Sequence, residues 1–261
     1  MEEWPARQHH VVLFITHCFE SGLSPNSIAT YIAGISYFHK LNNWGKLSDM
    51  FVVAKMLEGC HRLRQVKDLR APITQPVLAA ICEALNSVCS NEFETLLFSS
   101  LYTLAYFGLF RVSELVSPSR SQIGSPLQQS DVKYNSDKHS LVITLRATKT
   151  NQRAIPIQIK LPEENNAYNL CPVRAIQNYL TVRPLTGGPF FCHVDGSPVT
   201  RYQFSAVLNK SLRLTKFDLG HFKTHSFRIG RASDLAAQGI PSNAIMKMGR
   251  WQSACYKLYV R

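Results

Sequence analysis

The sequence predicts a mainly α-helical protein with one small antiparallel β-sheet. Apolar residues recur at helical spacing along most of its 261 residues. Two strand-like runs, SLVITLRA and AIPIQI, are rich in β-branched residues, and the short link KTNQR between them is typical of a hairpin turn. With 45% hydrophobic residues, the chain can bury one large core or two modest ones.

The N-terminal part predicts a small helical domain. Segment 11–22 is apolar at helical spacing and stops at a glycine. Ser-Pro at 24–25 supplies an N-cap and a first-turn proline for a second helix over 26–41. A third helix is predicted over about 49–64, and no strand pattern interrupts these segments. The residues that we expect on its inner face are Phe51, Val52, Met56 and Leu57.

The sequence turns basic and loses its apolar period over 62–72, which indicates a linker between two domains, 1–70 and 71–261. The proline at its end stops any helix. Clustered cations are most effective along a DNA backbone, so we expect the linker to bind there, with an ordinary solvated connection as the alternative. The four cations are Arg62, Arg64, Lys67 and Arg70.

The second domain begins with helices and continues into the hairpin. Its remaining elements are predicted to be helical, separated by a segment rich in glycine and proline. The predicted helices cover 75–87, 92–107, 171–182, 200–212, 226–239, 241–249 and 253–260.

Composition narrows the function classes. The formal net charge is +12, from 29 Lys and Arg against 17 Asp and Glu, and such a balance favours a polyanionic partner such as nucleic acid. No apolar run approaches the roughly 20 residues that span a bilayer, and the N-terminus does not resemble a secretory signal, so we expect a soluble intracellular protein. Seven scattered cysteines without a CxxC pair predict neither a disulfide framework nor a zinc site.

Two arginines and a histidine fit a site for phosphate. His225 and Arg228 lie three residues apart, on one face of a helix near its start, although an HxxR pattern alone is usually structural. Arg111 directly follows an apolar helix, where a charge needs a partner or a ligand. Glu114 is either its structural ion-pair partner or the group that orients Arg111 toward phosphate. Arginine forks match phosphate oxygens and suit phosphodiester transfer without a metal.

A lysine and the aromatic C-terminal segment complete the candidate set. Lys149 lies in the predicted hairpin link, where it is either solvated or a mobile general acid. The indole of Trp251 can donate to a phosphate oxygen. A phenol surrounded by cations is a usable nucleophile, and both Tyr256 and Tyr259 are available. The alternative is an amphipathic helix whose aromatic residues pack in a core.

In this order and spacing, the set resembles the tyrosine recombinase (phage integrase) superfamily. The strings FGLFRVSEL, HSFRIGRAS and GRWQSACYKLYVR look most like recombinases of eukaryotic mobile elements of the DIRS, Ngaro and Crypton kinds. The resemblance covers nearly the whole chain. It implies an N-terminal SAM-like core-binding domain that binds DNA and an integrase-like catalytic domain, arranged as a clamp around double-stranded DNA.

The resemblance also implies the chemistry. Arg111 and Arg228 would hold the scissile phosphate, Lys149 would protonate the 5′ hydroxyl, and His225 would bind the phosphate or take the tyrosine proton. Tyr259 would attack and form a 3′-phosphotyrosyl link, with no metal, ATP or other cofactor. Four protomers would assemble on two DNA sites, in the nucleus if the source is eukaryotic and otherwise with cytoplasmic DNA.

The sequence leaves open which residue is the fifth catalytic residue and which tyrosine is the nucleophile. The family usually has His or Trp nine residues before the nucleophile, but here Arg250 is nine before Tyr259 and Trp251 is eight before it. We favour Trp251 as the fifth catalytic residue, which leaves Arg250 as a DNA contact. Tyr256 lies one helical turn before Tyr259 and is the alternative nucleophile, although YVR matches the family better.

Other functions are compatible with the same residues. The chain ends two residues after Tyr259, where relatives usually continue with a helix that packs on a neighbouring protomer, so a fragment or a decayed copy is one interpretation. The alternatives to a recombinase are a catalytically silent DNA-binding protein derived from a mobile element and a type IB topoisomerase. The last alternative is a basic structural domain in which the motifs occur by coincidence.

Overall fold

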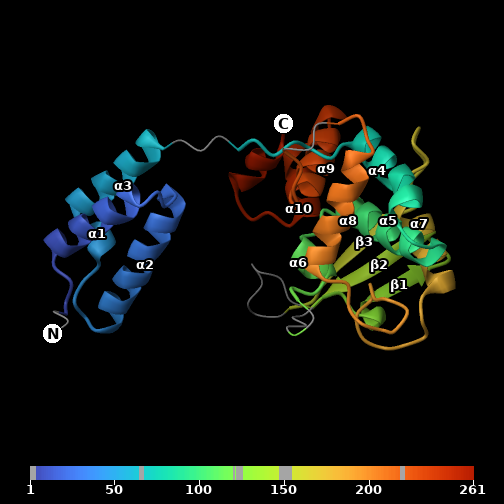
Figure 1. Ribbon diagram of the computed structural model, residues 1–261, viewed down its shortest axis with the longest axis horizontal. Coiled ribbons are helices and arrows are strands. Elements are labelled where there is room, and N and C mark those ends of the chain that lie inside the picture. The colour runs from blue at the N-terminus through green and yellow to red at the C-terminus, as the bar shows by residue number, and fades with distance from the viewer. Residues whose placement is uncertain (1–3, 65–67, 120, 122–125, 147–154, 218–220) are drawn as a thin grey trace. The chain divides into compact units, whose positions relative to one another are not determined.

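The helices gather into two separate units, Met1–Asp68 and Leu69–Arg261, in a computed structural model (Figure 1). The structure describes residues 4–64, 68–119, 121, 126–146, 155–217 and 221–261. The boundary between the units lies two residues before the predicted one. The predicted fold class, mainly helical with a small antiparallel sheet, is confirmed.

The N-terminal unit contains α1 (Gln8–Glu20), α2 (Pro25–Leu41), the 3₁₀ helix η1 (Leu47–Asp49) and α3 (Phe51–Leu63). The side chain of Ser24 accepts a hydrogen bond from the backbone of Ser27 at 3.1 Å, which is the predicted N-cap of α2. The buried core residues of this unit are Val11, Ile15, Cys18, Ile28, Ile32, Leu47, Val53 and Cys60.

The predicted inner face of α3 is partly wrong. Phe51 is 74% exposed and Val52 is also exposed, whereas Val53 and Cys60 are buried, with Met56 and Leu57 half-buried. Positions 53, 56, 57 and 60 follow the i, i+3, i+4, i+7 spacing of one helical face. Phe51 and Val52, the first two residues of α3, precede the first position of this face and lie on the solvent side.

The second unit contains a three-stranded antiparallel sheet in the order β1 (Val132–Asn135), β2 (Ser140–Leu145) and β3 (Ile157–Pro162). β2 and β3 pair from Ser140 opposite Pro162 to Leu145 opposite Ile157. β3 starts three residues later than predicted, because Pro156 cannot donate a backbone hydrogen bond to the ladder. The link KTNQR lies outside the described residues.

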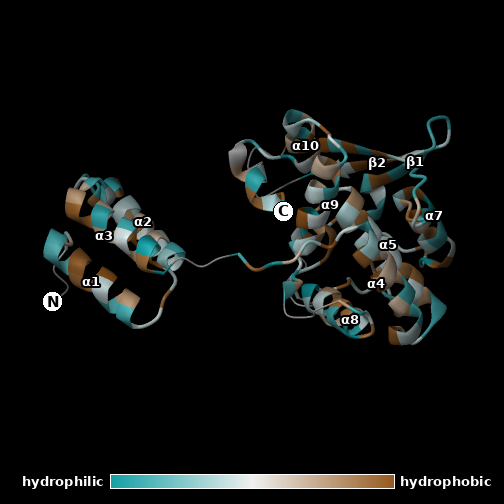
Figure 2. Ribbon diagram, turned by 90° about the horizontal axis from the view of Figure 1, so that it is seen from above, coloured by the Kyte–Doolittle hydropathy of each residue, from teal (hydrophilic) through white to brown (hydrophobic). Residues whose placement is uncertain are grey.

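Helices pack around this sheet and around one central helix, α5 (Glu92–Phe107), which is buried from Leu97 to Phe107 apart from one position. α5 contacts α4 (Gln75–Val88), α7 (Pro172–Val182) and α9 (Ser226–Ala237). Figure 2 shows hydrophobic and hydrophilic residues on these helices, the pattern of elements that cover a core. Within the described part of the chain, no helix has the length and apolar composition needed to cross a membrane.

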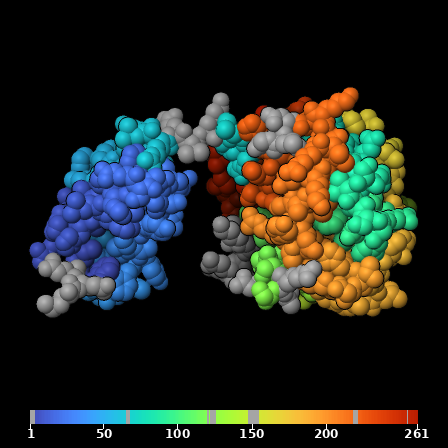
Figure 3. Space-filling view, viewed as in Figure 1, coloured from blue at the N-terminus to red at the C-terminus, as the bar shows by residue number. Residues whose placement is uncertain are grey.

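Three further helices and two 3₁₀ helices are described in the second unit. α6 (Val112–Leu115) follows α5, α8 (Arg201–Arg213) packs on α4 at the surface shown in Figure 3, and α10 (Ser242–Gly249) follows α9. The 3₁₀ helices are η2 (Gln129–Asp131) and η4 (Ala254–Tyr259). The C-terminal segment was predicted as an α-helix over 253–260, and the structure instead has the six-residue η4 there.

The start of α9 lies against the chain segment that leads into α4. The backbone N–H of Ile73 donates to the carbonyl of Ser226 at 3.0 Å. One turn along α9, a Cβ added to Gly230 would lie 1.7 Å from the carbonyl oxygen of Ile73, so only glycine permits this approach. The contact fixes α9, which carries His225 at its N-cap and Arg228 in its first turn.

Candidate active site

Arg111 lies between α5 and α6, where it forms the predicted pair with Glu114. The Glu114 carboxylate is buried and accepts from the backbone N–H of Arg111 at 2.8 Å and from its guanidinium at 3.1 Å. The Arg111 side chain keeps 19% of its surface exposed. Glu114 therefore fixes one side of the guanidinium and leaves its remaining donors for a ligand.

Arg228 is fully buried on α9 at 0% exposure. It donates to the carbonyl of Gly249 at 3.0 Å and to the carbonyl of Leu109. Burial, followed by the charges of Arg250 and Arg111, lowers the pKa of Arg228 to about 10, so it remains a cation at neutral pH. Its Nε atom is buried and has no hydrogen-bond partner among the described residues. A buried cation with a spare donor is well suited to an anion.

His225 lies at the N-cap of α9, three residues before Arg228. Its pKa is lowered, first by burial and then by the positive charges of Arg70, Arg228, Arg111 and Arg201. The imidazole is therefore neutral at neutral pH and has a free lone pair for a proton. Nδ1 of the ring is buried and makes no hydrogen bond to any described residue.

Trp251 packs beside Arg228, with 4.8 Å between the guanidinium carbon and the centre of the indole. A Cβ added to Gly249 would lie 1.8 Å from a ring carbon of Trp251, so the ring occupies space that only glycine leaves open. The same glycine offers its carbonyl to Arg228. The Gly-Arg-Trp string is thus a local structure that places the indole against the buried arginine.

Tyr259 lies at the end of η4, and its ring is close to Trp251, His225 and Arg228. Its ring centre is 5.0 Å from that of Trp251, 6.2 Å from that of His225 and 5.4 Å from the guanidinium carbon of Arg228. The Ser233 hydroxyl of α9 donates to the backbone carbonyl of Tyr259 at 3.4 Å and accepts from the backbone N–H of Arg261 at 2.9 Å. These two bonds tie the C-terminal segment to α9.

Tyr256 has different surroundings. It is buried in a small apolar cluster with Leu109, Leu235 and Ile245, and it lines a pocket of about 390 Å³ between α9, α10 and η4. Of the two tyrosines, it is Tyr259 that makes the described ring contact with His225 and the cation–π contact with Arg228. The geometry favours Tyr259 as the nucleophile, which stays a prediction.

Arg250 is buried beside the two arginines. Its guanidinium donates to the carbonyls of Gly108 at 3.1 Å and Leu109 at 3.0 Å and to the Glu114 carboxylate at 3.1 Å. These terminal nitrogens are bound to protein acceptors, whereas we expected Arg250 to contact DNA. Trp251, the residue favoured for the fifth catalytic position, is the one that touches Tyr259.

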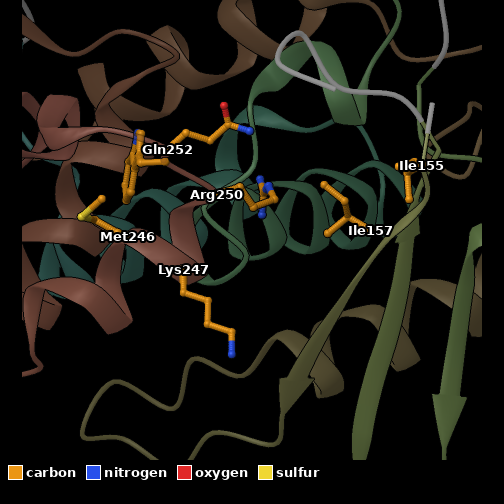
Figure 4. Close-up of a pocket in the computed structure, with 7 residues that line it drawn as sticks. Ile155, Ile157, Met246, Lys247, Arg250 and Gln252 are labelled. Atoms are coloured by element: carbon orange, nitrogen blue, oxygen red, sulfur yellow. The ribbon is translucent and has the colours of Figure 1, made fainter. Parts of the chain in front are cut away.

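The remaining predicted residues lie elsewhere or outside the described chain. Lys67 and Lys149 are outside the described residues. Ile155 lines a pocket of about 410 Å³ with Arg250 and Trp251 (Figure 4). Arg62 pairs with Glu58. Arg64 lies 3.9 Å over the ring of Phe19. The positive charge of Arg70 acts on His225, so it lies near the candidate site.

Two contributors were missed in the sequence. Ser233 lies five residues after Arg228 in the same helix, and nothing in its surroundings distinguishes it from an ordinary helical serine. Arg201 opens α8, where its backbone N–H donates to the carbonyl of Ser117 at 2.8 Å. The positive charge of Arg201 lowers the pKa of His225. In the sequence, only the basic character of α8 indicated a role for Arg201. Within the described residues, no group of three His, Cys, Asp or Glu side chains is placed to hold a metal ion.

The fold is similar to solved structures of two integrases and a site-specific recombinase. The chain superposes on the Tn1549 transposon integrase, in complex with circular intermediate DNA, with a TM-score of 0.64 and 14% identity, covering 98% of this chain and 81% of that one. It superposes on XerH site-specific recombinase bound to difH substrate with a TM-score of 0.67 and 12% identity, covering 98% of this chain and 67% of that one. With a lambda integrase dimer bound to a COC′ core site, the TM-score is 0.63 and the identity 13%, and the match covers 98% of this chain and 65% of that one. No curated protein matched the sequence.

The model of the phage integrase family matches residues 73–256, well over half of the chain. This span contains Arg111, His225, Arg228 and Trp251, and Tyr259 follows three residues after its end. The match agrees with the fold and confirms the resemblance to the tyrosine recombinase (phage integrase) family. The chain therefore belongs to the phage integrase family and is a tyrosine recombinase, a DNA-binding enzyme of site-specific recombination.

Proposed function

We propose that this recombinase cleaves one DNA strand by attack of Tyr259 on a phosphate held between Arg111 and Arg228. The observation that supports the proposal is an excess of buried positive charge. Arg111 and Arg250 both pair with one carboxylate, that of Glu114, and the fully buried Arg228 lies next to the phenol ring of Tyr259. A phosphodiester neutralises this excess, and its developing charge in the transition state is stabilised by the same fixed donors.

The cleavage step conserves the energy of the bond that it breaks. The phenolic oxygen of Tyr259 forms a bond to phosphorus as the bond from phosphorus to the 5′ oxygen breaks. The neutral imidazole of His225 takes the phenolic proton, and Lys149 gives a proton to the departing 5′ oxygen. The reverse reaction with another 5′ hydroxyl rejoins the strands, so the exchange consumes no ATP. Trp251 packs against both Arg228 and Tyr259 and maintains their separation.

The cellular role and assembly belong to the same proposal. The strings around Arg111, His225 and Trp251 favour a recombinase of a eukaryotic mobile element of the DIRS, Ngaro or Crypton kind, acting in the nucleus. We expect four copies on two DNA sites, because strand exchange needs two partners that are each cut twice. The lambda integrase structure similar to this chain is a dimer on a core site.

A covalent-adduct assay tests the proposal. The protein is incubated with radiolabelled DNA that carries a candidate site nicked near the cleavage position, so that the cut strand cannot be rejoined. We expect a protein–DNA adduct that survives denaturation and forms in the presence of EDTA. Tyr259→Phe should abolish the adduct and Tyr256→Phe should retain it. DNA binding without any adduct would favour a silent DNA-binding protein, and relaxation of supercoiled plasmid by monomers would favour a topoisomerase.

A further inference from the structure

We infer that Arg250 is a positioning residue that holds both phosphate-binding arginines, Arg111 and Arg228, in place. The inference rests on the proposed function, because it assigns those two arginines to the scissile phosphate. It differs from both roles expected from the sequence, in which Arg250 was a DNA contact or the fifth catalytic residue. Its support is a set of contacts that Arg250 shares with each of the two arginines.

The first shared contact is the carboxylate of Glu114. One of its oxygens accepts from the guanidinium of Arg111 at 3.1 Å, and the other accepts from Arg250 at 3.1 Å and from the backbone N–H of Arg111. A carboxylate that binds two guanidiniums cannot rotate without losing one of them. Arg250 therefore fixes the orientation of Glu114, which in turn fixes Arg111.

The second shared contact is the carbonyl of Leu109. Arg250 donates to this oxygen at 3.0 Å, and Arg228 donates to the same oxygen. Leu109 has φ of +48°, a left-handed conformation that a branched side chain rarely adopts, so the turn needs support from outside. Arg250 provides it with a further bond to the carbonyl of Gly108 at 3.1 Å.

Burial separates this role from a DNA contact. The Arg250 side chain is 8% exposed, and its guanidinium lies 5.1 Å from the centre of the Phe110 ring. Figure 4 shows Arg250 and Lys247 on the same pocket, with Lys247 extending away from Arg250. Lys247 is exposed, so it is the cation that DNA could reach from solvent and a matched control for Arg250.

The planar guanidinium is essential to this arrangement. Through its two terminal nitrogens, Arg250 reaches two separate segments, the Gly108–Leu109 turn and Glu114, and makes a longer contact of 3.5 Å to the carbonyl of Met248. A lysine keeps the charge but presents one nitrogen, so it cannot keep both segments. Arg250→Lys therefore separates geometry from charge, and Arg250→Met removes both while retaining most of the apolar stem.

The test is a double-mutant cycle on the rate of adduct formation in a single turnover, with enzyme in excess over the nicked substrate. We expect Arg250→Met to lower the rate about 100-fold and Arg250→Lys about 10-fold, with DNA affinity changed less than about 3-fold. Adding Arg250→Met to Arg111→Ala should cost about 10-fold rather than about 100-fold, because the part of the effect that acts through Arg111 is already lost and only the part that acts through Arg228 remains. Lys247→Met should cleave within about 3-fold of the wild type.

A modified substrate separates positioning from a general loss of structure. A methylphosphonate at the cleaved position removes one negative charge, so the reaction depends less on a correctly oriented Arg111. The deficit of Arg250→Met relative to the wild type should shrink at least about 10-fold on this substrate. A melting temperature near that of the wild type for Arg250→Lys shows that the fold is retained.

Several outcomes would overturn the inference. Rate losses that multiply in the double mutant, a deficit unchanged on methylphosphonate, or a loss of DNA affinity with an unchanged rate would each contradict a positioning role. The last outcome would restore Arg250 as a DNA contact. Failure of the proposed function looks different, because the wild-type chain would then form no adduct or Tyr259→Phe would still form one.

Discussion

Arg228 and Arg250 donate hydrogen bonds to the same atom, the carbonyl oxygen of Leu109. The two arginines come from α9 and from the end of α10, and Leu109 lies more than a hundred residues earlier in the turn after α5. Three separate segments thus meet at one peptide group. The candidate site is therefore organised around backbone carbonyls that hold its guanidiniums.

Replacing Arg228 by lysine should stop cleavage while leaving a folded protein that binds DNA. One ammonium cannot reach the carbonyls of Leu109 and Gly249 and also a phosphate. We expect the single-turnover rate to fall about 100- to 1,000-fold, with a much smaller change in DNA affinity. Gel-shift titration and adduct formation measure the two quantities separately. Equal losses of affinity and rate would show that Arg228 only helps to bind DNA.

Gly249→Ala should displace the indole of Trp251. The new methyl group would occupy the position of a ring carbon, so the ring or the backbone must move. We expect slower adduct formation by about 10-fold or more and a changed tryptophan emission spectrum. Gly59→Ala is the control, because a Cβ there, in the helix α3, has no heavy atom within 4 Å. A Gly249→Ala enzyme with wild-type rates would show that the indole position is unimportant.

His225 should make the stability of the free protein depend on pH. Its pKa is lowered in the folded state from the ordinary 6.5, first by burial and then by neighbouring arginines. The unfolded chain therefore binds more protons as the pH falls through about 6.5. The free energy of unfolding is retained above that pH and decreases below it. Urea unfolding at several pH values should show a smaller decrease for His225→Gln than for the wild type, and identical profiles would contradict this assignment.

Ser233→Ala should loosen the segment that carries the nucleophile. The hydroxyl makes bonds to the Tyr259 carbonyl and the Arg261 N–H, and both are lost with alanine. We expect adduct formation to slow about 10-fold with little change in melting temperature, since the bonds lie at the end of the chain. Ser242→Ala, at an exposed serine of α10, is the control. An unchanged rate for Ser233→Ala would mean that the apolar contacts of Tyr259 suffice.

DNA binding should weaken steeply with salt, because the site and its surroundings present several cations to phosphates. The logarithm of affinity should fall linearly with the logarithm of salt concentration, with a slope of about −0.9 per phosphate contact. Arg70 lies near His225. We therefore expect Arg70→Ala to make the slope shallower by the amount that one phosphate contact contributes. A slope equal to that of the wild type would place Arg70 away from the DNA backbone.

Local patterns predicted most of the fold and much of the site. Helical spacing placed His225 and Arg228 on one turn, and the three-residue interval correctly paired Arg111 with Glu114. The strand β1 was missed because VKYN is short and mostly polar, so it has no period to detect. Its pairing with β2 stabilises it, and that partner follows a turn rather than a recognisable hairpin signature.

The role of Arg250 could not be predicted from its neighbours. Its acceptors at Gly108, Leu109 and Glu114 lie 136 to 142 positions away in the sequence, and the turn at Leu109 has a positive φ that no glycine encodes. The usual nine-residue interval before the tyrosine points to Arg250, whereas the GRW string and the indole donor favoured Trp251 as the catalytic residue. Only the folded chain shows that one is buried among carbonyls and the other contacts the tyrosine. Tertiary contacts of this kind leave no periodic pattern in a sequence.

Ser233 holds Tyr259 by its carbonyl and leaves the phenol free. A nucleophile that becomes covalently joined to DNA has to follow the strand as the strands change partners. An anchor on the ring or hydroxyl would have to break before each reaction, whereas a main-chain tether persists through attack, covalent intermediate and release. In the proposed reaction, the Tyr259 side chain can therefore move with the DNA strand while its peptide group stays bound to α9.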